Sequence, residues 1–212
     1  MDDSKAILEA LKDAKRAVVI GGSFIAYELA EAFRARGLEV VWLMRGPYFL
    51  SSFGYLDEEG GLIVDLIARR AGVEIVCGDE AAEISVNSGR VKGVRTKRGR
   101  YFAADIVGVG IGLSLNVDFL KETPIRVNRG VVTDQYLKTS VPGVYAAGDV
   151  AEFYDLITGE QHTLGTWPNA ALQGKVAAKN MLGAEEPFLE VPDYTSGLFD
   201  SNIACSGVLP RD

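Results

Sequence analysis

Apolar residues in the first third of the chain recur with helical spacing in three stretches and form short continuous runs in three others. The predicted helices are 4–14, 24–36 and 57–71, and the predicted strands are 17–20, 40–43 and 73–76. Strand, helix and strand follow one another within about 30 residues, which is the size of a βαβ crossover. This order predicts a parallel sheet with helices packed against it.

Each predicted helix has a recognisable end or face. Ser4 can cap the first helix, and Gly37 and Gly72 follow the other two in the position of C-terminal glycines. The third helix carries its apolar side chains on one face. These are Leu62, Ile63, Leu66 and Ile67.

Beyond residue 76 the pattern changes to short extended segments separated by turns. Segments 82–86, 90–96 and 101–102, with turns at 87–89 and 97–99, predict a β-meander. Residues 105–109 then return as an apolar strand, which ends at Gly110, Ile111 and Gly112.

A second part of the chain starts near residue 125. The predicted elements are extended pieces over 126–132, a buried strand over 143–147, a polar loop over 151–165 and a helix over 168–181. We therefore expect an α/β chain with one domain over 14–122, a second over 123–190 and a stub over 191–212.

The first chemical signal is a glycine turn between the first β-strand and the helix that follows it. Gly21 suits a tight turn, and the N–H groups at the helix start favour a pyrophosphate. Compared with a Rossmann G-x-G-x-x-G motif, Ala26 keeps the close packing of helix and strand, whereas Ser23 either donates a hydrogen bond or weakens binding. The alternative is a tight turn without a ligand. The turn consists of Gly21, Gly22, Ser23, Phe24, Ile25 and Ala26.

The end of the second strand bears on which nicotinamide dinucleotide is bound. A carboxylate that holds the ribose 2′-hydroxyl normally lies about 20 residues after the glycine turn. Here that place is taken by Met44, followed by Arg45. A guanidinium can pair with a 2′-phosphate, so the sequence favours NADP over NAD. The alternative is that Arg45 is only a solvated residue at the strand end.

Composition narrows the classes of partner. A net charge of −7 over 212 residues argues against a nucleic-acid partner. No apolar run approaches the about 18 residues that span a bilayer, and the first residues lack the hydrophobic core of a signal peptide, so we expect a cytoplasmic protein without a membrane partner. Cys77 and Cys205 are far apart, and His162 is the only histidine, so we expect neither a disulfide scaffold nor a metal site.

Three stretches carry a family resemblance. Residues 139–149, which end at Gly148 and Asp149, resemble the second flavin-binding motif of the pyridine nucleotide-disulfide oxidoreductase superfamily. Residues 166–174 resemble the helix that follows this motif in its ferredoxin-reductase and NADH-oxidase-like branch. Residues 104–112 are similar to the exit of its nicotinamide domain. The resemblance covers essentially the whole chain, and it implies a Rossmann-like NAD(P)-binding domain followed by the second half of a FAD-binding domain.

The resemblance also implies roles for single residues. Asp149 would accept a hydrogen bond from the ribityl chain of FAD, and Gly148 would let that chain approach. The helix start at Trp167 would point at the flavin ring. The alternatives are a cap at a loop start for Asp149 and a core aromatic for Trp167. Four further residues would lie near the nicotinamide cofactor. For one of them, Glu28, the alternative is a solvated helix face. The four residues are Glu28, Gly110, Ile111 and Gly112.

The implied reaction is hydride transfer from NAD(P)H to FAD and onward to an acceptor that the sequence does not identify. No residue is assigned as catalytic acid or base, because His162, the only obvious proton carrier, lies in a polar segment typical of solvated histidines. The family's N-terminal βαβ unit, which binds the ADP half of FAD, is expected upstream of Met1. We therefore expect a fragment or a split-enzyme subunit that needs this N-terminal half, with self-association through open sheet edges. The alternatives are a non-catalytic nicotinamide-nucleotide-binding module and a non-functional truncation product.

Overall fold

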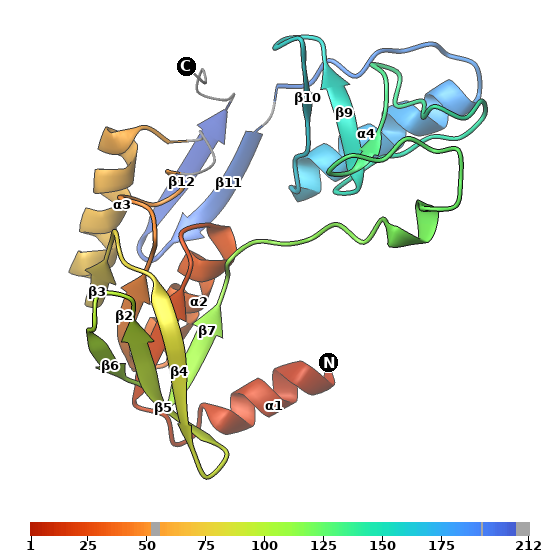
Figure 1. Cartoon of the computed structure of the whole chain (residues 1–212). Coiled ribbons are helices and arrows are strands. Elements are labelled where there is room, and N and C mark those ends of the chain that lie inside the picture. Colours follow the sequence, from red (N-terminus) through yellow and green to blue (C-terminus); the bar gives the residue numbers. More distant parts are fainter. Residues whose placement is uncertain (52–55, 192, 207–212) are drawn as a thin grey trace. The chain divides into compact units, whose positions relative to one another are not determined.

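The computed structural model describes residues 1–51, 56–191 and 193–206, without the side chains of residues 193, 194 and 205. The chain forms two compact units (Figure 1). The first contains Met1–Gly112 and Ser196–Ile203, and the second contains Leu113–Thr195.

A four-stranded parallel sheet is the centre of the first unit, with the strand order β3-β2-β1-β7. Helices α2 and α3 connect its strands (Figure 1), so the predicted α/β class is confirmed. The strands are β1 (Arg16–Ile20), β2 (Glu39–Leu43), β3 (Val73–Val76) and β7 (Ile106–Val109), and the helices are α2 (Phe24–Ala35) and α3 (Glu58–Arg70).

The two connecting helices bury different kinds of face. α2 buries Ala26, Tyr27, Ala30 and Phe33, and Gly37 ends it with a φ of 82°. α3 begins at Asp57, whose carboxylate accepts a hydrogen bond from the N–H of Gly60 at 2.8 Å.

The face that α3 turns inward is not its most hydrophobic one. Its buried residues are the small or branched Gly61, Val64 and Ala68. Leu62, Ile63 and Leu66, from the apolar face predicted by the sequence, are 57%, 60% and 50% exposed. Helical spacing therefore predicts the helix correctly, but it does not identify the packed face. Close packing against Tyr48 requires a glycine at position 61, because a methyl group there would lie 2.4 Å from the Tyr48 ring.

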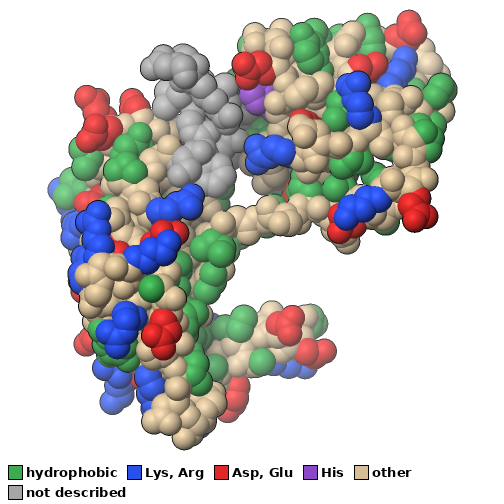
Figure 2. All heavy atoms as spheres, in the orientation of Figure 1, with side chains coloured by type: hydrophobic (Ala, Val, Ile, Leu, Met, Phe, Trp, Pro, Cys, Tyr) green, Lys and Arg blue, Asp and Glu red, His purple; other side chains and the backbone are tan. Residues whose placement is uncertain are grey.

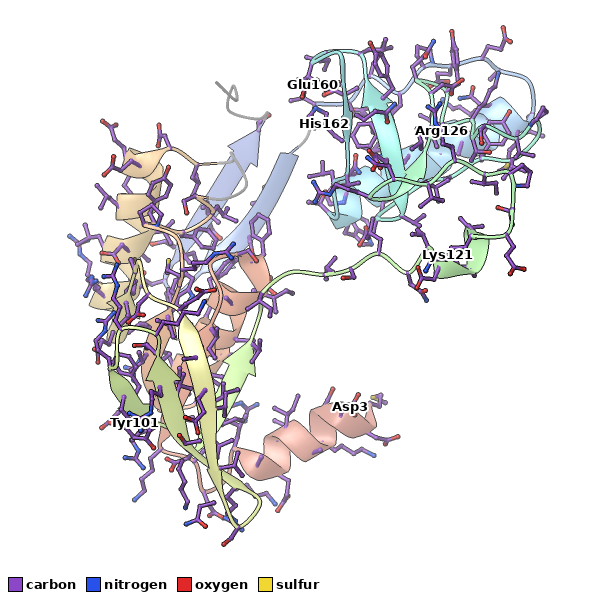
Figure 3. All side chains as sticks on the ribbon, viewed as in Figure 1. Asp3, Tyr101, Lys121, Arg126, Glu160 and His162 are labelled. Atoms are coloured by element: carbon purple, nitrogen blue, oxygen red, sulfur yellow. The ribbon has the colours of Figure 1, made fainter. Side chains whose placement is uncertain are left out.

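The predicted meander is confirmed as a three-stranded antiparallel sheet with the strand order β4-β5-β6. Ser88 and Gly89 have φ angles of 51° and 73°, as a tight hairpin turn requires. Val94 and Ala104 pack into one core with Val18, Leu43 and Val76 of the parallel sheet. The strands are β4 (Ala81–Asn87), β5 (Arg90–Thr96) and β6 (Tyr101–Ala103), and Figure 3 marks Tyr101 on the last of them.

The first helix differs from the prediction over 4–14. α1 spans Asp2–Ala10, begins after Met1 and buries no residue. Ser4 lies inside the helix, so its predicted role as the N-terminal cap is wrong. Asp2 and Asp3 occupy the first turn, where negative charge suits the helix dipole.

The second unit contains a three-stranded sheet, with the order β10-β9-β8, and the helix α4 (Trp167–Met181). The strands are β8 (Val131–Val132), β9 (Ala151–Asp155) and β10 (Glu160–His162). The helix agrees with the predicted 168–181. Within the described residues, no helix is long and apolar enough to cross a membrane.

The predicted polar loop over 151–165 is wrong, because β9 and β10 form a hairpin there. Two of its charged residues, Glu152 and Asp155, are buried. The Glu152 carboxylate is buried and accepts hydrogen bonds from the Asn128 side chain at 2.9 Å and the N–H groups of Arg129 and Gly130 at 2.9 and 3.0 Å. A buried carboxylate with three donors is a structural anchor, which a polarity pattern mistakes for a surface residue.

The predicted buried strand over 143–147 is also wrong. Only an isolated bridge between Lys138 and Tyr145 forms there, and Val144 is 36% exposed. One edge of the segment pairs with the preceding turn through the N–H of Ala146 and the carbonyl of Val144. Among the described residues, the N–H groups of Tyr145 and Ala147 on the other edge find no acceptor. The segment therefore lacks the second neighbour that a buried strand needs.

The last elements are β11 (Asp193–Leu198) and β12 (Ser201–Ser206), which form a two-stranded sheet. Ser196 accepts a hydrogen bond from the hydroxyl of Tyr27 on α2. Residues 207–212 of the predicted C-terminal stub lie outside the described residues.

We expect acid to weaken the first unit through Asp79, which joins the start of the meander to its β5–β6 turn. Burial raises the pKa of this carboxyl, but hydrogen bonds from Arg100 and from the N–H groups of Glu80 and Arg98 outweigh burial and lower the pKa from 3.8 to about 2. Because the folded state favours the charged form, the stabilisation is present above the ordinary pKa and is lost as the pH falls from about 4 to 2. The free energy of unfolding of the Asp79→Asn variant, measured by urea denaturation, should change less over this range. An unchanged pH dependence would contradict this role for Asp79.

Hydrogen exchange should reveal the unpaired edge of residues 143–147. Val19 is fully buried in the central strand of the parallel sheet, whereas the N–H of Tyr145 has no acceptor among the described residues. The amide of Tyr145 should exchange on the order of a hundredfold or more faster than that of Val19. Equal protection, measured by NMR or mass spectrometry, would mean that the edge is paired in solution.

Candidate functional site

The turn between β1 and α2 brings two backbone segments into close contact. Gly21 has a φ of 134°, and a methyl group on it would lie 2.0 Å from the carbonyl oxygen of Gly110. A methyl group on Gly110 would lie 2.8 Å from the backbone nitrogen of Ala26. The end of β7 is therefore seated against the start of α2, and only glycine fits at either contact.

Three hydrogen bonds hold this glycine turn in place. The N–H of Gly21 donates to the carbonyl of Leu43 at 2.9 Å, and the indole N–H of Trp42 donates to the carbonyl of Gly21 at 2.7 Å. The N–H of Leu50 donates to the carbonyl of Gly22 at 2.9 Å. Trp42 is fully buried and packs edge-to-face against Phe49. Residues from β2 and the loop after it thus fix a turn made by β1.

The start of α2 presents backbone donors without partners. Among the described residues, the N–H groups of Gly22, Ser23 and Ile25 have no acceptor, and the Ser23 hydroxyl caps none of them. Phe24 and Ser23 are half-buried, and Ile25 is 51% exposed. Backbone donors at the positive end of a helix, here one of 12 residues, can bind an anion such as a pyrophosphate.

Met44 and Arg45 follow β2 and lie in different environments. Met44 is buried, with 2% of its surface exposed, and its Cβ lies 3.5 Å from where a Cβ of Gly22 would be. Arg45 is exposed and lines a cavity of about 170 Å³. The other lining residues are Gly78, Asp79, Glu80, Lys97 and Arg98.

This Arg45 cavity has a mainly basic wall. Glu80 is paired with Lys97, whose Nζ lies 2.5 Å from the carboxylate, and that hydrogen bond together with the charges of Lys97 and Arg45 lowers the pKa of Glu80. The Asp79 carboxylate already forms an ion pair with Arg100. Arg45 and Arg98 form no ion pair within the described ranges, so their charges are available to an anionic group.

The remaining candidates of the first unit lie on its surface. Glu28 is exposed on α2, one helical turn after the glycine turn. Ile111 is 76% exposed, and Gly112 has a φ of 108°. None of these side chains is needed by the hydrophobic core.

The second unit assembles its candidate residues at the start of α4. Gly148 has a φ of 81°, and a methyl group on it would lie 3.5 Å from the Cβ of Ala170 in the first turn of the helix. The Asp149 carboxylate lies beside Gly165, just before the helix. Segments separated by some 20 residues in the sequence therefore meet at one helix end.

Several polar groups at this helix end lack partners. The Asp149 side chain is exposed and accepts no hydrogen bond from the described residues, which argues against the alternative of a loop cap. The Thr166 hydroxyl and the amide nitrogen of Gln173 are buried and have no hydrogen-bond partner in the described part of the chain. Trp167 is 84% exposed, which excludes the alternative of a core aromatic in this unit. Buried polar atoms without a partner are uncommon in proteins, so this helix end is a candidate for a binding site.

Two residues of these sites are not identified by the sequence. Gln173 is completely buried, and its side-chain oxygen accepts the N–H of Gly148 at 2.8 Å. Trp42 supports the glycine turn by donating its indole N–H to the carbonyl of Gly21. The sequence offers one signal for Gln173, because a polar residue on the inner face of a predicted helix is unusual. It offers none for Trp42, because an aromatic residue in a strand is ordinary.

His162 ends the β9–β10 hairpin, a few residues before α4 begins (Figure 3). Its Nε2 lies 2.7 Å from the Thr158 hydroxyl, which donates to Asp155 at 2.9 Å. This is a turn-stabilising arrangement. Burial raises the pKa of the Cys77 thiol, which is half-buried. No group of His, Cys, Asp or Glu that could hold a metal ion exists in the part of the chain that the structure describes.

Comparison with known proteins gives consistent results. The model of the pyridine nucleotide-disulphide oxidoreductase family matches residues 1–174. An NADH oxidase of Methanocaldococcus jannaschii is 31% identical over 90% of this chain and 42% of its own length. The ferredoxin–NAD(+) reductase component of an anthranilate 1,2-dioxygenase system from Burkholderia cepacia is 30% identical over 97% of this chain and 50% of its own length.

The fold agrees with these sequence relationships. The crystal structure of a ferredoxin reductase from Rhodopseudomonas palustris superposes with a TM-score of 0.92 at 30% identity, over 98% of this chain and 51% of that one. The chain thus spans about half the length of the relatives it matches, or less. Members of the family are oxidoreductases that use FAD and NAD(P)H. The chain belongs to the pyridine nucleotide-disulphide oxidoreductase family.

Proposed function

We propose that the first unit binds NAD(P)H at the glycine turn and that the second unit contributes half of a FAD site at the start of α4. The protein that contains both then passes hydride from NAD(P)H to FAD and on to an acceptor. The observation that carries this proposal is the set of unpaired N–H groups of Gly22, Ser23 and Ile25 above a turn that only glycine allows. The bound cofactors supply the redox chemistry, and the protein orients them.

In the first unit, residues 21–26 receive the pyrophosphate, and the absence of a side chain on Gly22 leaves its N–H accessible. Ser23 adds a hydroxyl beside the same donors. Gly110, Ile111 and Gly112 form the opposite wall of the site, and Glu28 provides a carboxylate one helical turn along α2. We propose residues 14–122 as the extent of this domain.

In the second unit, we propose residues 123–190 as the half of a FAD-binding domain. Asp149 accepts from the hydroxyls of the flavin side chain, and Gly148 keeps the approach open. The positive end of α4 at Trp167 stabilises negative charge on a reduced ring. Gln173 keeps the turn at Gly148 in position through the N–H that it accepts. We also propose that the unpaired edge at Tyr145 and Ala147 is where a neighbouring strand pairs, either from the rest of the protein or from a second copy.

The Arg45 cavity favours NADPH. A 2′-phosphate at the end of β2 would meet Arg45 and Arg98, which have no ion-pair partner among the described residues, together with Lys97. The negative charge of Glu80 is paired with Lys97. Basic side chains around a small cavity suit a phosphate better than a bare hydroxyl.

A non-catalytic nicotinamide-nucleotide-binding module is the second candidate. It is favoured by one observation: the proposed nucleotide site is built within the first unit alone, whereas the FAD features of the second unit leave buried polar groups unpaired. Such a module would bind the dinucleotide without turnover until a separate N-terminal half completes the FAD site.

Charge reversal at Arg45 tests the nucleotide site. In calorimetric titrations, the unaltered chain should bind NADPH at least as tightly as NADH. Arg45→Glu should weaken NADPH binding about tenfold or more and reverse the preference, because a charge-assisted hydrogen bond contributes about 1.5–3 kcal/mol. Arg90→Glu, on the exposed β4–β5 hairpin, is the control with the same change in charge and should bind as before. If neither dinucleotide binds the unaltered chain, the proposed function of the first unit is wrong.

The FAD content tests the second unit. Because the chain spans only part of the relatives' length, we expect the purified 212-residue chain to carry far less than one FAD per chain. Absorbance of the supernatant after denaturation measures the amount. A stoichiometric yellow preparation would show that the start of α4 holds FAD unaided, and Asp149→Ala should then release it.

A further inference from the structure

Within the described residues, the helix α3 leaves an apolar stripe exposed. Leu62, Ile63 and Leu66 are each at least half exposed, and Ile67 is partly exposed beside them. Figure 2 shows hydrophobic side chains over this helix between acidic side chains at its upper end and basic ones lower down. No residue of the proposed nucleotide or FAD sites lies on α3.

The ends of this α3 stripe carry opposite charges. Glu59 precedes Ile63 by four residues, and Arg70 follows Leu66 by four, so both lie on the same side of the helix as the apolar residues. Both are exposed, and neither forms an ion pair within the described residues. The stripe therefore runs from acid through apolar residues to base.

The stripe is complementary to the same stripe on a second copy that runs in the opposite direction. The pairs Glu59 with Arg70, Leu62 with Ile67 and Ile63 with Leu66 are all centred on the same point, between Val64 and Asp65. If two α3 helices pack antiparallel about a two-fold axis at that point, each acid faces the base of the other copy and each apolar residue faces an apolar residue. A two-fold interface requires this kind of self-complementarity.

We propose that the α3 stripe is an interface between two copies of this chain, packed as an antiparallel helix pair. The charge pattern favours a second copy over an unrelated partner, because each stripe supplies both halves of every pair. One helix pair buries less than the about 1,200 Å² of a standard interface, so the dimer forms reversibly at raised protein concentration.

Light scattering and sedimentation of the 212-residue chain across a concentration series test the interface. The mass should rise from 22.8 kDa toward about twice that value. Ile63→Glu should weaken association at least about tenfold, because it places two carboxylates against apolar side chains. Leu182→Glu, at a 90% exposed position after α4, is the control and should leave the association unchanged.

Charge exchange makes the test specific for the antiparallel geometry. Glu59→Arg and Arg70→Glu alone should each weaken the dimer at low salt, since each places like charges opposite one another twice. The double variant carrying both changes should restore it, because every pair is then reversed but intact. Circular dichroism checks that each variant is folded.

Two results would overturn the proposal. One is a mass of one chain at all concentrations, which would leave the α3 stripe without a second copy. The other is association that persists in Ile63→Glu, which would assign self-association to another surface, such as the edge at Tyr145. Neither result affects the proposed nucleotide binding, which calorimetry measures independently of the mass.

Discussion

The first unit depends on a contact between two backbones. The carbonyl of Gly110, at the end of β7, lies where a side chain of Gly21 would be, and Gly110 itself is pressed against the start of α2. This contact allows the helix to begin directly above the ends of the central strands, so that its unpaired N–H groups open to solvent at the edge of the sheet. A side chain at Gly21 or Gly110 would push the helix away and disrupt both the packing and the proposed anion site.

Both units place their candidate chemistry at a helix start. In each, a glycine with positive φ brings the chain close to the first turn, and a side chain from elsewhere holds that glycine in place: Trp42 for Gly21 and Gln173 for Gly148. The two side chains that fix these glycines are themselves completely buried. Substitutions in these buried supports are expected to alter cofactor binding without touching the cofactor.

The sequence predicts the first unit better than the second, for a physical reason. In the first unit, apolar runs predict the strands of the parallel sheet, and the glycines that follow the helices predict where those helices end. In the second, Glu152 is a charge that the fold buries with three donors, so polarity hides the hairpin at 151–162. The segment 143–147 has the composition of a buried strand but lacks a partner on one edge among the described residues, and composition alone does not reveal a missing neighbour.

The residues of the candidate sites also differ in how far the sequence predicts them. Gly21, Gly148 and Asp149 are recognisable because motifs carry them, and the structure brings each to a helix start. The sequence gives no signal for Trp42, and for Gln173 only that of a polar residue on the inner face of a predicted helix. Their roles arise from hydrogen bonds to residues more than 20 positions away in the chain. The cavity lined by Arg45 joins residues from the segments that follow β2 and β3 and from the β5–β6 turn, and only the fold brings them together.

The two tryptophans of the chain give each unit its own optical reporter. Trp42 is fully enclosed beneath the glycine turn and bound to its carbonyl, so its emission belongs to an apolar, rigid environment. Trp167 is almost entirely in solvent at the start of α4, and its emission belongs to water. A ligand arriving at either helix start would therefore change a different part of the fluorescence spectrum, and occupancy of the two units could be followed separately in the same sample without a label.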